Sequence, residues 1–204
     1  MKWSDDIAYA TGIIATDGNL TGGIRKSINI TSKDFEIVNN CKKILNLPNK
    51  IGKKSNGPNK EKKYFVIQSR NRDIYDFLTK IGITPVKSKT IGTLRVPVKY
   101  FCDFLKGCID GDGNICIFNH PESKSPQLKL RLYSASPKFL EWIKNIISKR
   151  IKVKGGWITY SKGIGTLSFG KSDSIKILDI LYRNKNSYYL IRKYRIYKTF
   201  TGEW

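Results

Sequence analysis

The sequence carries one pattern twice: residues 8–18 read AYATGIIATDG, and residues 103–113 read DFLKGCIDGDG. In each stretch, an apolar segment with helical character contains a glycine and ends in an Asp-Gly pair. The two aspartates, Asp17 and Asp112, lie 95 residues apart, which is close to half of the 204 residues. Self-similarity at a fixed spacing is the signature of a duplicated structural unit. The sequence therefore predicts a chain of two similar halves.

The segments that follow the two copies match in kind and in order. Alternating apolar residues predict strands, and apolar residues at helical spacing predict helices. We expect strands at 27–32 and 64–69 and helices at 35–45 and 72–81 in the first half, and strands at 128–134, 156–161 and 166–169 and helices at 138–149 and 173–182 in the second. Each half then ends in a basic segment, at 84–90 or 189–200.

The order common to both copies is helix, two strands, helix, two strands, helix. We therefore predict an α+β fold with two pseudo-symmetric αββαββα halves, residues 1–95 and residues 96–204. The loops differ in length between the copies, which indicates a diverged duplication. The linker falls at about 91–100, where Pro97 marks the entry to the second half.

The charge balance of the chain points to a polyanionic partner. Lys and Arg number 38 against 16 Asp and Glu, which gives a net charge of +22 and a pI near 9.9. Such an excess creates a long-range positive field, and a phosphate backbone is its commonest partner. A ribosomal protein, a protein of a membrane surface and a merely solvated basic face are the alternatives at this point.

Cysteine and histidine are too sparse for most metal or nucleophile chemistry. The four cysteines form no CxxC pair, and the only histidine is His120, in a polar loop. A zinc site is therefore not expected, and reduced thiols are typical of an intracellular protein. No apolar run approaches the length of a membrane span, and no signal-peptide core begins the chain. We expect a soluble protein that contacts no membrane and is cytoplasmic, or organellar if the host is eukaryotic.

The Asp-Gly pairs stand where a helix would end, and this position is unfavourable for a carboxylate. An acid at a helix C-terminus opposes the helix dipole and costs about half a kcal/mol. Two such cases at equivalent places suggest a compensating positive charge, for which a divalent metal is the natural candidate. We expect the following glycine to form a left-handed cap. The small residues that would let the two helices approach closely, and so bring Asp17 and Asp112 together, are Ala10, Gly12, Ala15, Gly107 and Gly111.

These two stretches resemble the LAGLIDADG motif of homing endonucleases and related RNA maturases. The motif positions are 10–18 and 105–113, and the second copy matches better, with departures mainly at Lys106 and Cys108. The first copy has Ala15 where the motif has its earlier acid. The resemblance covers essentially the whole chain, because the αββαββ order is also that of the family. It implies antiparallel sheets that form a DNA-binding saddle, with the motif helices packed at its centre.

The resemblance also implies a reaction, a metal and a substrate. The family makes a double-strand break in a long double-stranded DNA site and leaves short 3′ overhangs, and a chain with both motifs acts as a monomer. Two or more Mg²⁺ ions would be held near the scissile phosphates, whereas Ca²⁺ would support binding without cleavage. Metal lowers the pKa of the attacking water and neutralises charge on the leaving oxygen. The implied ligands are Asp17 and Asp112, with the backbone carbonyls of Ala15, Thr16 and Gly111.

A basic residue near the phosphate in each half is a further implication of the resemblance. Lys87 or Lys89 in the first half and Lys193 in the second are the candidates for polarising the phosphate or ordering water. Lys33, after the strand at 27–32, is another candidate. In a chain this basic, any single lysine could instead make a diffuse phosphate contact.

Recognition of DNA would come from the outward faces of the strands. Strand alternation places Ile28, Ile30, Phe65, Ile67, Leu128, Leu130 and Leu132 on the helix-covered face. Arg can pair with guanine edges, and Asn or Gln with adenine, in the major groove. A solvated polar face is the alternative for some of these positions. The outward set is Ser27, Asn29, Thr31, Gln68, Arg70, Gln127, Lys129, Arg131 and Tyr133.

Two other functions fit the same resemblance. An RNA maturase would assist the splicing of its own intron RNA without cutting DNA, and a regulator would bind DNA without catalysis. Retention of both Asp17 and Asp112 favours the nuclease, since neither alternative needs both acids. The chain is too short for intein splicing blocks, so an intron-encoded or free-standing gene is expected.

Overall fold

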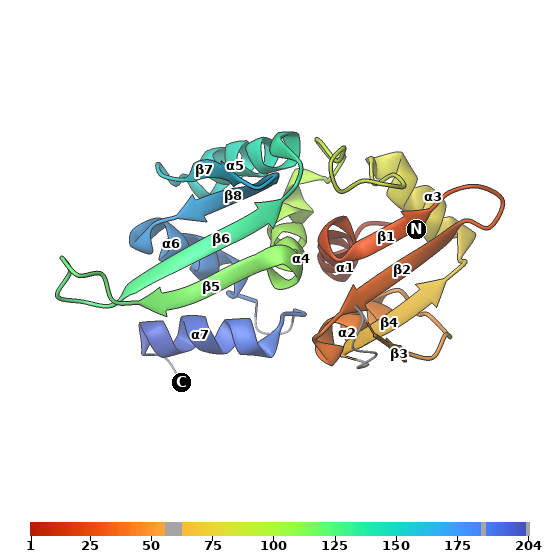
Figure 1. Ribbon diagram of the computed structural model, residues 1–204, viewed down its shortest axis with the longest axis horizontal. Helices are drawn as coiled ribbons and strands as arrows, with labels where there is room; N and C mark the ends of the chain where they lie inside the picture. Colours follow the sequence, from red (N-terminus) through yellow and green to blue (C-terminus); the bar gives the residue numbers. More distant parts are fainter. Residues whose placement is uncertain (56–62, 185–186, 203–204) are drawn as a thin grey trace.

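The computed structural model contains two four-stranded antiparallel sheets flanked by helices (Figure 1), and it describes residues 1–55, 63–184 and 187–202. The predicted α+β fold with a duplicated architecture is confirmed. The elements of the first part are α1 (Asp5–Thr16), β1 (Gly18–Thr21), β2 (Ser27–Ser32), α2 (Phe35–Ile44), β3 (Gly52–Lys54), β4 (Tyr64–Ser69) and α3 (Arg72–Ile81).

The second part repeats this order, with a short 3-10 helix before it and one further α-helix after it. Its elements are η1 (Val98–Tyr100), α4 (Phe101–Asp112), β5 (Gly113–Phe118), β6 (Gln127–Ser134), α5 (Pro137–Ile151), β7 (Trp157–Ser161), β8 (Ile164–Phe169), α6 (Lys171–Leu181) and α7 (Ile191–Thr201). The strand order is β1-β2-β4-β3 in one sheet and β5-β6-β8-β7 in the other, so the two sheets have the same topology.

Each sheet is covered by helices on one face and open on the other. In Figure 1 the two sheets face the viewer and most of the helices lie behind them. The inward residues Ile28, Ile30 and Ile67 are buried, as are Leu128, Leu130 and Leu132. Phe65 is only half-buried and packs its ring against Phe35, with centroids 5.2 Å apart. The period-two alternation of the strands thus predicted the buried face of both sheets.

The halves meet along helices α1 and α4, which pack side by side at the centre of the molecule (Figure 1). The contact is too close for any side chain at its middle. A Cβ on Gly12 would lie 2.1 Å from the Phe104 carbonyl oxygen, and a Cβ on Gly107 would lie 2.1 Å from that of Tyr9. The prediction that small residues let the two helices approach is therefore confirmed.

The glycines of the two Asp-Gly pairs do not form left-handed caps, and that expectation was wrong. Gly113 has φ −94° and ψ 164°, and both glycines begin a strand directly after the helix, at β1 and β5. Close packing requires them instead. A Cβ on Gly18 would lie 2.7 Å from Ile14 Cα, and one on Gly113 would lie 2.4 Å from the Ile109 carbonyl oxygen. The chain therefore turns from helix to strand without any intervening loop.

Helix α7 extends the second half back toward the first. It lies beside β5 and its first turn reaches α2 (Figure 1). Over residues 1–55, 63–184 and 187–202, no helix is long and apolar enough to span a lipid bilayer.

Candidate metal and DNA-binding site

Asp17 and Asp112 stand at the ends of the paired helices. Asp17 caps α1, with its N–H donating to the Ile13 carbonyl at 2.8 Å, and Asp112 is the last residue of α4. The two carboxylates are near enough to interact. Burial, and then the charge of Asp112, raise the pKa of Asp17 to about 7. Desolvation also raises the pKa of Asp112, although the residue as a whole is exposed.

This pair of carboxylates fits a divalent cation. In the described part of the chain, no donor forms a hydrogen bond to either side chain, so their oxygens are open to an outside ligand. Raised pKa values mean that the negative charge of each carboxylate is poorly compensated by the protein. Two hard oxygen donors in such surroundings are what Mg²⁺ prefers.

The remaining ligands would have to be backbone or solvent oxygens. No cluster of three or more His, Cys, Asp or Glu side chains suited to a metal occurs in residues 1–55, 63–184 and 187–202. Of the three predicted carbonyl donors, that of Thr16 already accepts a hydrogen bond from Lys87. Ala15 is buried, and Gly111 lies against Thr16, whose Oγ1 would be 2.1 Å from an added Cβ.

Lys87 reaches the end of α1 from the turn segment that precedes the second half. Its side chain is 4% exposed, and Nζ donates to the Thr16 carbonyl at 3.1 Å. Burial lowers the pKa of Lys87, against the opposing effect of Asp112 and Asp17. Lys87 also lines a cavity together with Asp112 and Tyr133.

Lys193 reaches the end of α4 from helix α7 and is 3% exposed. Its Nζ donates to three carbonyls, those of Ile109, Asp110 (2.9 Å) and Gly113 (2.7 Å). Burial lowers its pKa to about 8. Each motif helix therefore ends against a buried ammonium group, which offsets the dipole at that terminus. The sequence pattern predicted a metal as the compensating charge, and the contribution of the two lysines was not predicted.

Lys89 and Lys33, the other two predicted lysines, are exposed. Lys33 Nζ lies 5.5 Å above the ring of Tyr64. The positive charges of Lys87 and Lys193 oppose the rise in the pKa values of Asp17 and Asp112. Lys89 and Lys33 are not among the groups that act on these two carboxylates. The structure thus brings together one basic residue from each half with the two acids.

Asp110, the earlier acid of the second motif, has a structural setting that sequence reasoning did not foresee. It is fully buried, and Oδ2 accepts hydrogen bonds from Tyr9 Oη at 3.0 Å and from the Leu190 N–H at 2.7 Å. Its Oδ1 has no partner among the described residues. Burial raises the pKa of Asp110 to about 6, whereas Lys193 lowers it. The carboxylate therefore joins α1, α4 and the start of α7.

The open face of the first sheet is polar. Residues in register on neighbouring strands share a face, and Asn19, Asn29 and Gln68 form one row across β1, β2 and β4. Thr31 is half-buried on the same face, and Arg70 follows the end of β4 and is exposed.

Ser27 was predicted to be available on this face, but it is 2% exposed. Its hydroxyl pairs with Thr21 Oγ1 at 2.8 Å and accepts from Gln68 Nε2 at 3.2 Å. Ser27 therefore positions Gln68 and is not itself available for contact.

The open face of the second sheet is basic and aromatic. Arg131 lies in a row with Asn114, Ser168 and Trp157. Lys129 Nζ lies 4.9 Å from the ring centroid of Phe118 and 5.7 Å from that of Trp157. Tyr133 is half-buried on this face, and Gln127 Nε2 donates to Ser123 Oγ at 2.8 Å.

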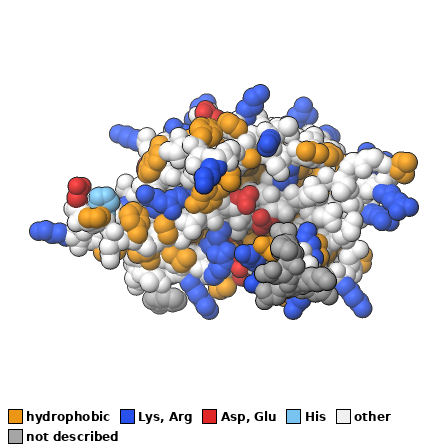
Figure 2. Space-filling model, in the orientation of Figure 1, with side chains coloured by type: hydrophobic (Ala, Val, Ile, Leu, Met, Phe, Trp, Pro, Cys, Tyr) orange, Lys and Arg blue, Asp and Glu red, His pale blue; other side chains and the backbone are white. Residues whose placement is uncertain are grey.

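Asn19, Asn114 and Trp157 were missed as members of these rows. No strand was located directly after either Asp-Gly pair, whereas the short strands β1 and β5 begin there. The alternation GNICIF at 113–118 was the available signal. Figure 2 shows acidic side chains near the middle of this face, with Lys and Arg beside them and toward both ends.

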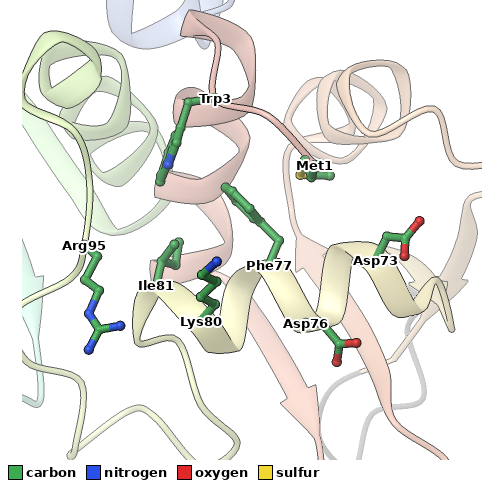
Figure 3. A pocket seen from close by; sticks show the side chains of 8 residues that line it. All are labelled: Met1, Trp3, Asp73, Asp76, Phe77, Lys80, Ile81 and Arg95. Atoms are coloured by element: carbon green, nitrogen blue, oxygen red, sulfur yellow. The ribbon is translucent and has the colours of Figure 1, made fainter.

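A second pocket lies between the N-terminus and α3 (Figure 3). Trp3 and Phe77 form its apolar part, with ring centroids 5.0 Å apart, and Lys80, Arg95 and Asp76 surround it. None of the residues predicted from the sequence as site residues lines this pocket, and its mixed charges do not favour a polyanion.

Searches by sequence and by structure gave different results for this chain. No family model matches the sequence, and no curated protein matches it. Solved structures match over most of the chain. A mesophilic variant of the homing endonuclease I-DmoI has a TM-score of 0.64 at 16% identity, covering 94% of this chain and 96% of that one. The chain has the LAGLIDADG fold.

Two other LAGLIDADG structures show how widely this fold is shared. The meganuclease I-SmaMI bound to uncleaveable DNA has a TM-score of 0.65 at 13% identity, covering 98% of this chain and 90% of that one. The N-terminal LAGLIDADG domain of WhiA has a TM-score of 0.59 at 17% identity, covering 95% and 88%. The resemblance drawn from the two motifs is therefore confirmed at the level of the fold.

Proposed function

We propose that this chain is a site-specific endonuclease that makes a double-strand break in DNA with divalent metal ions. The observation that carries the proposal is the convergence of Asp17 and Asp112 at the ends of α1 and α4, between two sheets with open polar faces. The charge of Asp112 raises the pKa of Asp17, which supports a shared cation site. Structural neighbours include I-DmoI in complex with its target DNA in the presence of magnesium, and I-SmaMI bound to DNA.

Asp17 and Asp112 would hold Mg²⁺ with their carboxylate oxygens, helped by the carbonyl of Gly111 or Ala15. Bound there, the metal supplies an acidified water and neutralises charge on the phosphate and on the leaving 3′ oxygen. Lys87 and Lys193 stabilise the motif helix ends that carry the acids. No histidine is required, since the acidity of the water comes from the metal.

The substrate follows from charge and geometry. The net charge of +22 favours a phosphate backbone. Amide groups in the row Asn19, Asn29 and Gln68 suit adenine edges, and Arg131 suits guanine. One chain holds both acids, so we propose that a monomer cuts both strands and leaves 3′ overhangs.

The test separates recognition from chemistry. A random duplex library is selected for binding to the full chain in Ca²⁺, and the enriched pool is then moved to Mg²⁺. We expect one long site that is bound in Ca²⁺ and cut in Mg²⁺. Asp17→Asn and Asp112→Asn should abolish cutting and leave binding in place. Asp73→Asn, on the exposed first turn of α3, is the matched control and should cut normally.

Two outcomes would contradict the proposal. A site that is bound but stays whole would make the chain a DNA-binding protein without catalysis on the same fold. If no DNA is enriched, the selection should be repeated with structured RNA. Enrichment of intron RNA would then favour the maturase.

A further inference from the structure

We propose that the outer end of the second sheet carries a binding site for a phosphate group, formed by His120, Lys129 and Lys171. These three side chains line a cavity of about 330 Å³ between the β5–β6 connection and the start of α6. In Figure 1 this connection projects from the sheet at the end away from α1 and α4. Figure 2 shows the histidine, in pale blue, at the left end of the open face. The site goes beyond the proposed nuclease, because a phosphate can bind there without metal and without cleavage.

The hydrogen bonding of His120 fixes which of its ring nitrogens can donate. Its Nδ1 accepts the N–H of Glu122 at 3.2 Å. A neutral imidazole has one N–H, so an accepting Nδ1 places the hydrogen on Nε2. Nε2 has no acceptor within the described part of the chain. Because the side chain is exposed, this N–H is available to a phosphate oxygen.

The two lysines bring positive charge that no carboxylate neutralises. Among the described residues, neither Lys129 nor Lys171 forms an ion pair. Lys129 Nζ lies 4.9 Å from the ring centroid of Phe118 and 5.7 Å from that of Trp157, and neither ring cancels its charge. Lys171 Nζ donates to Ser125 Oγ at 3.2 Å, which holds it against the β5–β6 connection. An ammonium group has three N–H donors, so both lysines keep donors for a ligand.

The start of α6 leaves the cavity open on one side. Gly170, the N-cap of this helix, lines the cavity, and nothing lies within 4 Å of a Cβ built on it. Because the N-cap has no side chain, it cannot accept from the first N–H groups of the helix, and such groups favour a nearby anion. The acid of the first turn, Asp173, is used elsewhere, since its Oδ2 accepts the Gly155 N–H at 2.9 Å.

The charges around the cavity favour an anion, and the donors favour phosphate among anions. Of the described residues that line it, Glu122 alone is acidic, against the two ammonium groups. The excess of positive charge attracts an anion. The N–H donors of His120, Lys129 and Lys171 approach from three different segments, and a tetrahedral phosphate presents acceptor oxygens in as many directions. A planar carboxylate would leave part of these donors without an acceptor.

Two sources carry such a phosphate: the backbone of a nucleic acid on the open face, and a free phosphate or nucleotide. Gln127, Lys129 and Arg131 alternate along β6 and share the open face. This face therefore runs without interruption from the row that contains Arg131 to the cavity. The continuity favours a backbone phosphate at the flank of a bound duplex.

The only histidine of the chain is the reporter for the first experiment. The full chain with isotope-labelled histidine gives one ring signal by NMR. Inorganic phosphate is added in EDTA, and sodium chloride at matched ionic strength is the reference. We expect a saturable shift of the signal with phosphate and no such shift with chloride.

Paired variants test the charges at the cavity in the same titration. Lys171→Gln should weaken phosphate binding on the order of 10-fold, because a hydrogen bond to a charged group is lost. Glu122→Gln should strengthen it, because a like charge beside the phosphate is removed. Lys149→Gln and Glu141→Gln make the same changes of charge at exposed positions of α5, away from the cavity, and should leave binding unchanged.

The second experiment identifies the source of the phosphate. The titration is repeated after the chain has been saturated with a double-stranded DNA, again in EDTA. If the duplex itself shifts the histidine signal and removes the response to phosphate, the cavity holds a backbone phosphate. If phosphate still shifts the signal as before, the site stands and its ligand is a free phosphate group.

A shift that rises linearly with either salt would overturn the inference. Equal weakening in Lys171→Gln and Lys149→Gln would do the same, since binding would then follow the overall charge of the protein. Both experiments run without Mg²⁺, so a chain that fails to cut DNA leaves the inference intact. A chain that cuts its site but shows no saturable response to phosphate overturns the inference alone.

Discussion

Arg192 and Asp34 form a bidentate ion pair between the two halves of the molecule. Arg192 Nε donates to Asp34 Oδ1 at 2.9 Å, and Nη2 donates to Oδ2 at 2.8 Å. The neighbouring Ile191 N–H donates to Glu36 Oε2 at 3.1 Å. Helix α7 is thus joined to the start of α2, 158 residues earlier in the chain. Because α7 also carries Lys193, this contact helps to place a charged group at the end of α4.

Arg192→Ala should destabilise the protein slightly. The Arg192 side chain is 55% exposed, and pairs of this kind contribute about 1 kcal/mol or less. The hydrogen bonds from Arg192 hold the pKa of Asp34 below its usual range. The stabilisation is therefore present at neutral pH and is lost as pH falls through the lowered pKa of Asp34. Urea unfolding of Arg192→Ala, Asp34→Ala and the double variant measures the coupling, with Arg195→Ala as control. A coupling that persists at pH 2 would contradict this assignment.

Gly12→Ala and Gly107→Ala should each separate the motif helices. The added Cβ would lie 2.1 Å from a backbone carbonyl oxygen of the partner helix, so the backbones must shift apart. We expect a loss of about 3 kcal/mol or more, as for severe overpacking. Gly92→Ala is the control, because nothing lies within 4 Å of its added Cβ. Chemical denaturation measures all three, and wild-type stability in Gly12→Ala would show that the close contact is not required.

Asp17→Asn should stabilise the metal-free protein at high pH. The pKa of Asp17 is about 7 in the folded state, above its ordinary value of 3.8, so folding favours the protonated form. The contribution of Asp17 to the free energy of unfolding is therefore fully present below pH 4. It is lost as the pH rises toward 7, by up to about 1.4 kcal/mol per pH unit. Because Asn cannot ionise, the Asp17→Asn variant does not lose stability in this way as the pH rises. Unfolding at pH 5 and pH 8 in EDTA tests the prediction, which fails if both proteins show the same slope.

Addition of Mg²⁺ at pH 8 should stabilise the wild type more than Asp17→Asn. A cation that binds only the folded state raises its stability by mass action. The thermal midpoint at increasing Mg²⁺ gives the measurement, and Asp73→Asn should follow the wild type. Equal midpoint shifts in the wild type and in Asp17→Asn would argue against a metal ion at Asp17.

Tyr9→Phe should cost about 1–2 kcal/mol of stability without altering the packing of α1. The Tyr9 hydroxyl donates to buried Asp110, whose Oδ1 has no partner within the described part of the chain. Removing a donor to a buried carboxylate leaves that group less compensated. The stability cost of Tyr9→Phe should be smaller in a protein that also carries Asp110→Asn. Comparison of the two single variants with the double variant therefore tests the pairing. Purely additive losses from the two substitutions would show that the hydroxyl and the carboxylate do not interact.

The duplicated fold could be predicted because each of its main elements leaves a local pattern. Helices α2 and α3 were predicted within one residue of their observed ends, because apolar residues recur at helical spacing along both. Strands β1 and β5 were missed because they start immediately after the motif helices, where an Asp-Gly pair suggests a turn. The direct change from helix to strand depends on the tight packing of Gly18 and Gly113. The spacing of residues in the sequence does not indicate it.

The candidate site was predictable in its acids but not in their surroundings. Asp17 and Asp112 occupy equivalent positions in the two motifs. Lys87 and Lys193 lie in the basic segments that end the two halves. The number of hydrogen bonds that each lysine makes depends on contacts between residues more than 70 positions apart. Lys106, a departure from the motif, is likewise fully buried and bonds to Asp103 and Ser187. Pairings between distant residues, such as that of Lys106 with Ser187, leave no trace in local sequence patterns.

The contact between Gly12 and Gly107 has a consequence for how such a protein can change over time. The spacing of the two acids is set by a rigid contact between helix backbones, while the outward-facing polar residues stand on strands at some distance from it. Under the proposed function, substitutions on the open faces would alter which nucleic acid is bound and would leave the geometry of the acids unchanged. Partner choice and chemistry would then change independently of each other, around a contact that has no side chain at all.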